Sequence, residues 1–206
     1  EVEEFFAKIK FPFTVGYGMT ECAPLISYSE AKDFIPKSSG KMLKGIMEAK
    51  IDRPDPNTGV GEIFVRGENV MSGYYKNPEA TEQILDTEGW LHTGDLGTLD
   101  AEGNVFIRGR NKTMILSANG QNIYPEELEA KLNNMPFVME SLVIESNGKL
   151  IALVCPDYEA VDAEGLDQKA LDDVMEDNRK LLNSMGAAYE NVAKIQLYPN
   201  EFEKTP

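Results

Sequence analysis

The chain has 206 residues, of which 42% are hydrophobic and 27% are charged, and its formal net charge is −15 at pH 7. This composition is typical of soluble globular proteins, and the length allows one large domain or two small ones, each able to bury a core. The acidic excess argues against nucleic acid as a partner, because non-specific affinity for a phosphate backbone comes from clustered Lys and Arg.

The two cysteines, Cys22 and Cys155, show no CxxC or metal-ligand spacing. They indicate a reducing compartment such as the cytoplasm, and we expect both to be small buried hydrophobic residues. No apolar run approaches the length of a bilayer span, and the longest, at 150–155, suits a strand. The chain opens inside an expected helix at 2–9 and its last residues carry no stop signal, so we expect both ends to be cuts through a longer protein.

A weak strand pattern at 11–15 runs into Gly16-Tyr17-Gly18 and predicts a strand that ends in a turn flanked by glycines. Thr20 and Glu21 follow closely. Together these residues offer an aromatic face, a hydroxyl donor for phosphate and a hard oxygen ligand for a metal. On their own they are explained better by an ordinary loop with a capping threonine.

The next part of the chain alternates short β-like runs with turns rich in Gly and Pro. The runs lie at 25–28, 46–51 and 62–65. Regular spacing of this kind predicts a small antiparallel barrel or sandwich. A short helix is expected next, because Asn77 is a favourable N-cap and Pro78 suits the first helical turn.

The segment from Gly89 to Gly97 holds the only Trp and the only His of the chain. For His92 we favour a structural role, because no nucleophile or second titratable partner lies nearby in sequence. Asp95 is different, since it follows Thr-Gly at the start of a predicted strand. A carboxylate in that place can accept two hydrogen bonds from the vicinal hydroxyls of a ribose.

From Asp95 onward, strand and helix patterns follow one another closely. The expected elements are hairpin strands at 95–99 and 104–109, a strand at 114–116, a polar loop at 117–122, a helix from Pro125, strands at 138–145 and 150–155, a helix at 167–184 and a strand at 192–198. Asn147-Gly148 is a strong hairpin signal. The order β, α, β, β, α, β from Met114 onward predicts an α+β domain with helices packed on one small sheet.

Five segments resemble, in order, the core motifs of the AMP-forming acyl-CoA synthetases, which belong to the adenylate-forming superfamily. They are Tyr17-Gly18-Met19-Thr20-Glu21, Gly61-Glu62 with Arg66-Gly67, Gly73-Tyr74-Tyr75-Lys76-Asn77-Pro78, Trp90-Leu91-His92-Thr93-Gly94-Asp95 and Gly109-Arg110-Asn111-Lys112. Each motif alone is weak, and their fixed order along the chain makes the resemblance specific. Within the superfamily, the segment 119–129 is most similar to the long-chain fatty-acid–CoA ligases.

The resemblance implies a mixed fold made of two parts of a larger enzyme. Residues 1–109 would be a small antiparallel β-barrel-like subdomain at the end of the large N-terminal domain. Residues 110–112 would be a hinge, and residues 113–206 a mobile α+β C-terminal domain, truncated at its end. A polar tripeptide between two strand signals suits a hinge, because a few residues can absorb a large change in the backbone.

The resemblance implies a reaction in two steps. The carboxylate of a fatty acid attacks the α-phosphate of ATP to give acyl-AMP and pyrophosphate, and the CoA thiolate then displaces AMP. The first step crowds negative charge at phosphorus, so Mg²⁺ and positioned donors are required. We therefore expect ATP, Mg²⁺, CoA and a fatty acid as cofactors and substrates of a cytoplasmic enzyme. Peripheral contact with a membrane would suit long-chain substrates, although no basic amphipathic helix for anionic lipid is evident.

The resemblance also assigns roles to the first motif. Glu21 would bind Mg²⁺ and Thr20 would donate to the α-phosphate, which makes both residues catalytic. Tyr17 would lie against the adenine ring, and Gly18 belongs to the same nucleotide-binding motif.

Further roles fall at and beyond the boundary between the two predicted domains. By resemblance, Asp95 takes the ribose hydroxyls and Arg110 contacts the ribose. Lys112 occupies the position about which the small domain rotates between adenylation and thioester formation. Gly120 and Gln121 belong to the loop at the channel for the pantetheine arm of CoA, where a glycine lets the arm pass close to the backbone.

Two parts of the family pattern are expected outside this chain. The phosphate loop and most of the acyl-binding domain lie upstream of the first motif. The adenylation lysine belongs to a motif that should begin at 203–206, where Lys204 fits the lead-in better than the lysine itself. We therefore expect the parent enzyme to be a ligase and the isolated chain, without the remainder of the parent chain, to be unable to make acyl-adenylate.

Three alternatives remain open. The acceptor of the acyl group could be an acyl-carrier protein, or the acid could be an aryl acid, because the acyl pocket lies upstream of these residues. A non-catalytic nucleotide-binding module that kept Asp95 and Arg110 is the third, and Glu21 would be unnecessary in such a module.

Overall fold

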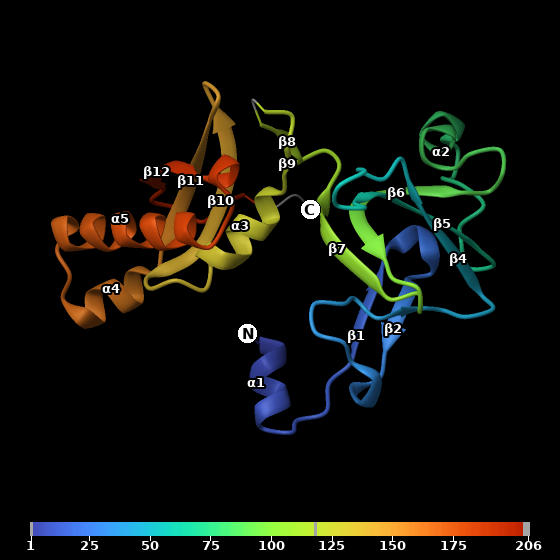
Figure 1. The fold of residues 1–206 in the computed structure, drawn as a ribbon, viewed down its shortest axis with the longest axis horizontal. Coiled ribbons are helices and arrows are strands. Elements are labelled where there is room, and N and C mark those ends of the chain that lie inside the picture. The colour runs from blue at the N-terminus through green and yellow to red at the C-terminus, as the bar shows by residue number, and fades with distance from the viewer. Residues whose placement is uncertain (1, 118, 204–206) are drawn as a thin grey trace. The chain divides into compact units, whose positions relative to one another are not determined.

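The computed structural model describes residues 2–117 and 119–203, so Lys204 lies outside the described residues. The chain divides into two compact units, Glu1–Lys112 and Thr113–Pro206 (Figure 1). Each unit has a hydrophobic core of its own. A hinge at 110–112 and a mobile second unit stay predictions.

The first unit contains short helices and two antiparallel sheets (Figure 1). Its elements are α1 (Val2–Lys8), β1 (Val15–Gly18), η1 (Thr20–Cys22), β2 (Leu25–Ser29), η2 (Ala31–Asp33), β3 (Lys41–Met42), β4 (Met47–Asp52), β5 (Gly61–Gly67), α2 (Pro78–Ile84), β6 (Leu91–Leu99) and β7 (Val105–Arg110). The strands pair in the orders β1-β2-β3 and β4-β5-β6-β7. Fully buried Ile26, Ile63, Val65 and Leu91 belong to its core.

The predicted barrel is wrong, because neither sheet of the described first unit closes on itself. Strands β4 and β7 lie at opposite ends of the four-stranded order, and an isolated antiparallel bridge between Lys41 and Asn104 joins the two sheets. A closed barrel needs tilted and staggered strands, about five to eight in small examples. Among the described residues, no strand pairing links β1 to β4, so the two bridged sheets stay open at their outer edges. The spacing of strands along a sequence does not specify which sheet edges pair.

The segment Gly16–Gly18 is strand and not the predicted turn. Tyr17 lies opposite Ser27 in the antiparallel pairing of β1 with β2. A Cβ atom on Gly18 would stand 1.9 Å from the carbonyl oxygen of Pro24, so glycine is needed for this close approach of the two segments. The turn comes later, at η1, and ends at Ala23 in the left-handed region with φ of 54°.

Two local predictions in the first unit are confirmed. The Asn77 side chain caps α2 by accepting a hydrogen bond of 3.1 Å from a first-turn backbone N–H. The hairpin of β6 and β7 turns through Gly103, whose φ of 84° is left-handed. Strand β6 begins earlier than predicted, because Leu91 pairs with Val65 and is fully buried.

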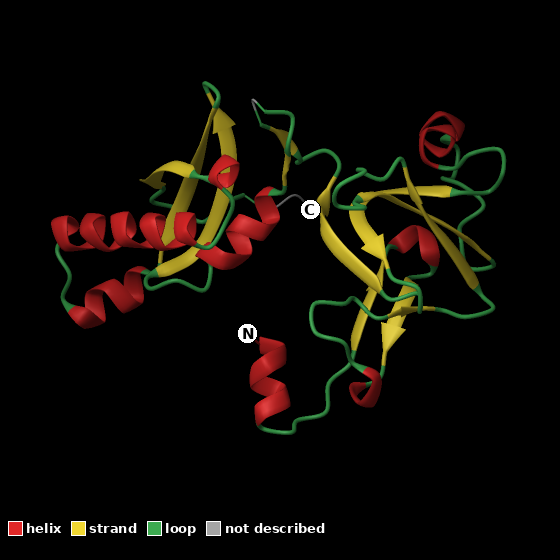
Figure 2. Cartoon of the chain, viewed as in Figure 1, coloured by secondary structure: helices red, strands yellow, loops and turns green. Residues whose placement is uncertain are grey.

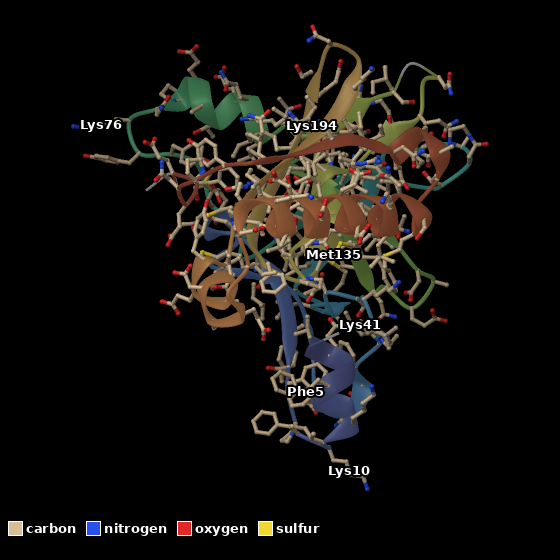
Figure 3. All side chains as sticks on the ribbon, turned by 90° about the vertical axis from the view of Figure 1, so that its left-hand side faces the viewer. Phe5, Lys10, Lys41, Lys76, Met135 and Lys194 are labelled. Carbon is tan, nitrogen blue, oxygen red and sulfur yellow. The ribbon has the colours of Figure 1, made fainter. Side chains whose placement is uncertain are left out.

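The N-terminal helix α1 contacts the rest of its unit through aromatic rings. The ring centre of Phe6 lies 5.3 Å from that of Phe11 and 5.5 Å from that of Phe13. The Phe13 ring in turn meets Phe34 edge-on at 4.7 Å. Lys10 extends from the turn after the helix into solvent (Figure 3). Ring contacts therefore account for the position of this helix within the first unit.

The second unit consists of a small sheet, a separate two-stranded ribbon and helices. Its elements are β8 (Ile115–Leu116), β9 (Asn122–Ile123), α3 (Pro125–Leu132), β10 (Val138–Ser146), β11 (Lys149–Pro156), α4 (Tyr158–Glu164), α5 (Gln168–Ser184), η3 (Ala188–Glu190) and β12 (Val192–Leu197). Strands β10 and β11 are antiparallel, whereas β12 runs parallel to β11. Helices α3 and α5 pack on this sheet and on each other (Figure 2).

Local signals predicted most of the second unit correctly. Asn147 and Gly148 form the turn between β10 and β11 with left-handed φ values of 52° and 73°. Asp167 caps α5, which ends at Ser184 as predicted. The short helix α4 was not predicted, since Val161 is its one buried residue and a single apolar position leaves no periodicity to detect.

Cys22 and Cys155 are free, buried thiols, which confirms the prediction for both. They belong to different units and to different elements, η1 and β11. Among the residues that the structure describes, no helix has the length and apolar character needed to cross a membrane.

Candidate functional site

The centre of the candidate site is an irregular part of strand β6. Between Phe64 and Glu62, β5 advances by two residues while β6 advances by four, from His92 to Leu96. The extra residues bend out of the ladder, and Gly94 takes up this bend with a left-handed φ of 73°. Irregularities of this kind redirect side chains, and here they present Asp95.

Side-chain hydrogen bonds replace the missing ladder bonds of this bulge. The Thr93 hydroxyl donates to the carbonyl oxygen of Ile63 at 2.7 Å and accepts from the backbone N–H of Asp95 at 3.1 Å. The backbone N–H of Gly94 donates to the Glu62 carboxylate at 3.0 Å. The backbone around Asp95 is thus held by neighbouring side chains.

Asp95 joins three strands of the first unit through its two carboxylate oxygens. The Tyr17 hydroxyl on β1 donates to Oδ2 at 2.7 Å, and Nε of Arg110 on β7 lies 3.0 Å from Oδ1. Burial, with a further contribution from Asp95, raises the pKa of Tyr17 well above its ordinary range. The phenol therefore remains a hydrogen-bond donor, and the Asp95 side chain is only 15% exposed.

This cluster can bind a polar ring with adjacent hydroxyl groups. A carboxylate has about four lone-pair positions, so Asp95 can accept from ligand hydroxyls while it holds Tyr17 and Arg110. The Arg110 side chain is 62% exposed and adds positive charge at the edge of the site. The structure thus brings together three of the predicted nucleotide-binding residues.

The second part of the site is Glu21 on η1. The Tyr74 hydroxyl donates to its Oε1 at 2.6 Å, and the backbone N–H of Met71 donates to its carbonyl oxygen at 2.8 Å. The hydrogen bond to Glu21 raises the pKa of Tyr74 to about 12. Tyr74 therefore stays protonated near neutral pH and fixes one carboxylate oxygen, while the residues that the structure describes place no hydrogen-bond partner on Oε2.

Glu21 is suited to Mg²⁺ that arrives with a nucleotide. Within the described ranges, no three His, Cys, Asp or Glu side chains gather as a metal cage. Mg²⁺ keeps several waters and commonly binds through one or two carboxylates together with substrate phosphates. A single half-buried carboxylate with one oxygen already oriented fits that requirement.

The remaining predicted residues are exposed. Thr20 and Gly18 border Tyr17 and Glu21 in the same segment, and Lys112 ends the first unit. In the second unit, Gly120 has a left-handed φ of 75° with open space where a Cβ would be. The Gln121 backbone N–H donates to Ser117 Oγ at 2.9 Å. Their predicted roles toward phosphate, hinge motion and CoA stay predictions.

Sequence reasoning missed the residues that support the site. Glu62 and Tyr74 both lie in the motif segments noted above, but nothing local indicates that they contact Gly94 and Glu21. Asn69 belongs with them, because its Nδ2 donates to the carbonyl oxygens of Cys22 and Leu25, both at 2.7 Å. Only Glu62 carried a local signal, as a charged side chain within a predicted strand, whereas Asn69 and Tyr74 lie outside the strands and gave none.

Residues 1–75 match the family model described as AMP-binding enzyme. The chain is 41% identical over 155 residues to 4-coumarate-CoA ligase 2 of Narcissus pseudonarcissus, covering 68% of this chain and 27% of that protein. It is 30% identical over 201 residues to the long-chain-fatty-acid–CoA ligase ACSBG2 of Rattus norvegicus, covering 95% and 29%. The chain thus spans less than a third of either relative's length.

A solved structure extends the similarity to the fold. O-succinylbenzoate Coenzyme A synthetase from Bacillus subtilis, in complex with AMP, aligns with a TM-score of 0.78 and 30% identity over 98% of this chain and 40% of that chain. The same protein with ATP and a magnesium ion aligns with a TM-score of 0.74. The relatives named here are acid–CoA ligases, of aryl acids and of fatty acids.

Proposed function

We propose, on the premise that this chain belongs to the AMP-binding enzyme family of the adenylate-forming superfamily, that the protein activates a carboxylic acid with ATP and transfers the acyl group to CoA. The observation that carries the proposal is the cluster of Tyr17, Asp95 and Arg110, which three strands bring together around one shielded carboxylate. A shielded carboxylate with spare lone pairs is suited to accept hydrogen bonds from the vicinal hydroxyls of a ribose, which supports this proposal.

In the proposed reaction, the described residues bind and orient the nucleotide. Asp95 accepts hydrogen bonds from the two ribose hydroxyls. Arg110, the last residue of β7, contacts the same sugar. Tyr17 presents its ring to the adenine while its hydroxyl stays on Asp95. A fixed ribose restricts the position of the α-phosphate, which favours attack by the substrate carboxylate.

Glu21 and Thr20 serve the phosphate end of the nucleotide. We propose that Glu21 holds Mg²⁺ through Oε2 and that Thr20 donates to the α-phosphate. When bound, Mg²⁺ supplies positive charge to the phosphate oxygens. Tyr74 keeps the Glu21 side chain in one orientation by its bond of 2.6 Å.

A long-chain fatty acid is our first proposal for the substrate. It is supported by the similarity to a fatty-acid ligase, which extends over 95% of the chain and so includes the second unit. An aryl acid is the second candidate, because identity is higher, at 41%, to a 4-coumarate ligase over 68% of the chain. We further propose that Lys112 is the pivot of a domain rotation and that Gly120 and Gln121 lie at the CoA channel. A cytoplasmic location and peripheral contact with a membrane are also proposed.

The experiment is a substrate panel on the full-length protein. It is incubated with ATP, MgCl₂, CoA and one acid at a time, from the fatty-acid and the 4-hydroxycinnamic-acid classes, and AMP and acyl-CoA are quantified. We expect AMP and acyl-CoA in equal amounts, with turnover highest for one acid class. Absence of AMP release with every acid, despite AMP binding, would favour a non-catalytic nucleotide-binding module. AMP release without acyl-CoA would indicate a different acceptor such as a carrier protein.

A further inference from the structure

The contacts of Glu62 assign it a task beyond the nucleotide-binding residues themselves. Glu62 lies on β5, half-buried, next to the bulge of β6. Its Oε1 accepts the backbone N–H of Gly94 at 3.0 Å, and its Oε2 accepts Nδ2 of Asn111 at 3.2 Å. One carboxylate therefore contacts both the residue before Asp95 and the residue before Lys112.

A third hydrogen bond links Asn111 directly to Gly94, so that Glu62, Gly94 and Asn111 are each bonded to the other two. The backbone N–H of Asn111 donates to the carbonyl oxygen of Gly94 at 2.8 Å. Gly94 is thus held through its N–H by Glu62 and through its carbonyl by Asn111. Because glycine has wide backbone freedom, its left-handed conformation here depends on such bonds.

We propose that Glu62 is a positioning residue that couples the ribose-binding carboxylate of Asp95 to the segment 110–112. Its bond to Gly94 sets the direction in which the Asp95 side chain points away from β6. In that direction the side chain contacts Tyr17 and Arg110. The bond of Glu62 to Asn111 restrains the backbone that leads into Lys112. This inference rests on the proposed function, and Glu62 acts through these neighbours without contact to the reacting atoms.

The coupling has a consequence for the two half-reactions. If the proposed rotation about the 110–112 segment changes the torsions of Asn111, the bond between Asn111 and Glu62 is formed in one of the two states and broken in the other. The state in which the bond is formed gains a charge-assisted hydrogen bond. Loss of Glu62 therefore affects nucleotide affinity through Gly94 and the balance between adenylation and thioester formation through Asn111.

The test compares Glu62→Ala, Glu62→Gln and Asn111→Ala in the full-length protein. Glutamine is the conservative variant, because the amide oxygen of the new side chain can still accept the backbone N–H of Gly94. The NH₂ group of the same side chain can donate to Oδ1 of Asn111 once the Asn111 amide has flipped. Glu48→Ala is the matched control, since Glu48 is an exposed carboxylate on the neighbouring strand β4 that pairs with Arg66.

The first measurement is hydrogen exchange of peptides that cover 91–97 and 109–113. We expect Glu62→Ala to accelerate exchange in both by about tenfold, the size of effect for loss of a hydrogen bond to a charged group. Glu62→Gln should remain within about threefold of the unaltered protein. Glu48→Ala should leave both peptides unchanged. This measurement needs no turnover, so it stands even when the proposed reaction fails.

The second measurement separates KM for ATP from the rates of the two half-reactions. We expect Glu62→Ala to raise KM for ATP about tenfold, with recovery in Glu62→Gln. Asn111→Ala should leave KM within about twofold and change the ratio of thioester formation to adenylation about fivefold. The proposal is overturned when Glu62→Ala matches Glu48→Ala in exchange. It is equally overturned when exchange rises in an active enzyme whose KM and half-reaction ratio are unchanged.

Discussion

At the scale of single residues, the site depends on shielding one carboxylate. Asp95 is only 15% exposed and is bonded by a phenol and a guanidinium from two other strands. A hydrogen bond to an ionised group contributes more than one between neutral groups, and more so where water is scarce. If Asp95 binds a ribose as proposed, the affinity should therefore depend strongly on the charge of this one side chain.

Replacing Asp95 by Asn tests that dependence, because the side chain keeps its size and loses its charge. We expect the Kd for AMP to rise about 10- to 100-fold, since each lost charged hydrogen bond contributes about 1.5–3 kcal/mol. Titration calorimetry of the full-length protein measures the effect. Asp33→Asn, at an exposed position of η2, is the control and should bind AMP normally. Unchanged affinity in Asp95→Asn would remove the ribose role.

The thiols provide a second prediction at this scale. Burial raises the pKa of Cys22 to about 11, and burial also raises the pKa of Cys155. Only the thiolate reacts with disulfide reagents, and at pH 8 about one Cys22 in a thousand is ionised. We expect neither cysteine to be labelled rapidly in the native protein and both in denaturant, as measured by peptide mass. Labelling should rise as the pH approaches 11, and rapid native labelling at pH 8 would contradict the burial.

At the scale of elements, short polar signals set the ends of helices and hairpins. Asn77, Asp157 and Asp167 each accept a hydrogen bond from a first-turn N–H of the helix that follows. These bonds use donors that a helix cannot satisfy internally. The boundaries of α5 were predictable for this reason, because the cap and the apolar stripe lie in one continuous segment.

Replacing Asp167 by Ala removes the cap of α5. The Asp167 carboxylate accepts the backbone N–H of Ala170 at 2.8 Å. We expect the free energy of unfolding of the second unit to fall by about 1 kcal/mol. Urea denaturation followed by exchange of α5 peptides measures this. Asp173→Ala, at an exposed position of the same helix, should leave the midpoint within error, and an equal loss there would show that the cap is not responsible.

At the scale of the whole molecule, the chain contains two separate cores. Ile63 is fully buried in the core of the first unit and Leu132 in that of the second. Large-to-small changes in a core cost the lost transfer energy together with the cavity left behind. Because the clusters do not share residues, we expect each unit to respond to its own core only.

Ile63→Ala and Leu132→Ala test this independence. Each should destabilise its own unit by about 2–5 kcal/mol and leave the other within about 0.5 kcal/mol, since distant sites are additive. Urea titration with pulsed exchange, read on peptides from β5 and from α3, measures both units in one sample. Simultaneous loss of protection in both units in either variant would show a single cooperative domain.

The features that depend on neighbouring residues could be predicted from the sequence alone. The cap at Asn77, the turn at Asn147-Gly148 and the span of α5 follow from local backbone preferences and apolar periodicity. The ordered motifs also pointed to the family and to Asp95 as a carboxylate of interest. These signals act over a few residues, so they need no knowledge of the fold.

Contacts between segments far apart in the sequence became known only from the fold. The two open sheets in place of a barrel, the parallel pairing of β12 with β11, and the contacts of Glu62 and Tyr74 all depend on pairing between segments far apart in sequence. The energy of such pairing comes from the burial of both partners at once. The sequence of one strand therefore does not identify the strand with which it pairs. For that reason the sequence predicted the carboxylate, while the fold revealed what holds it in place.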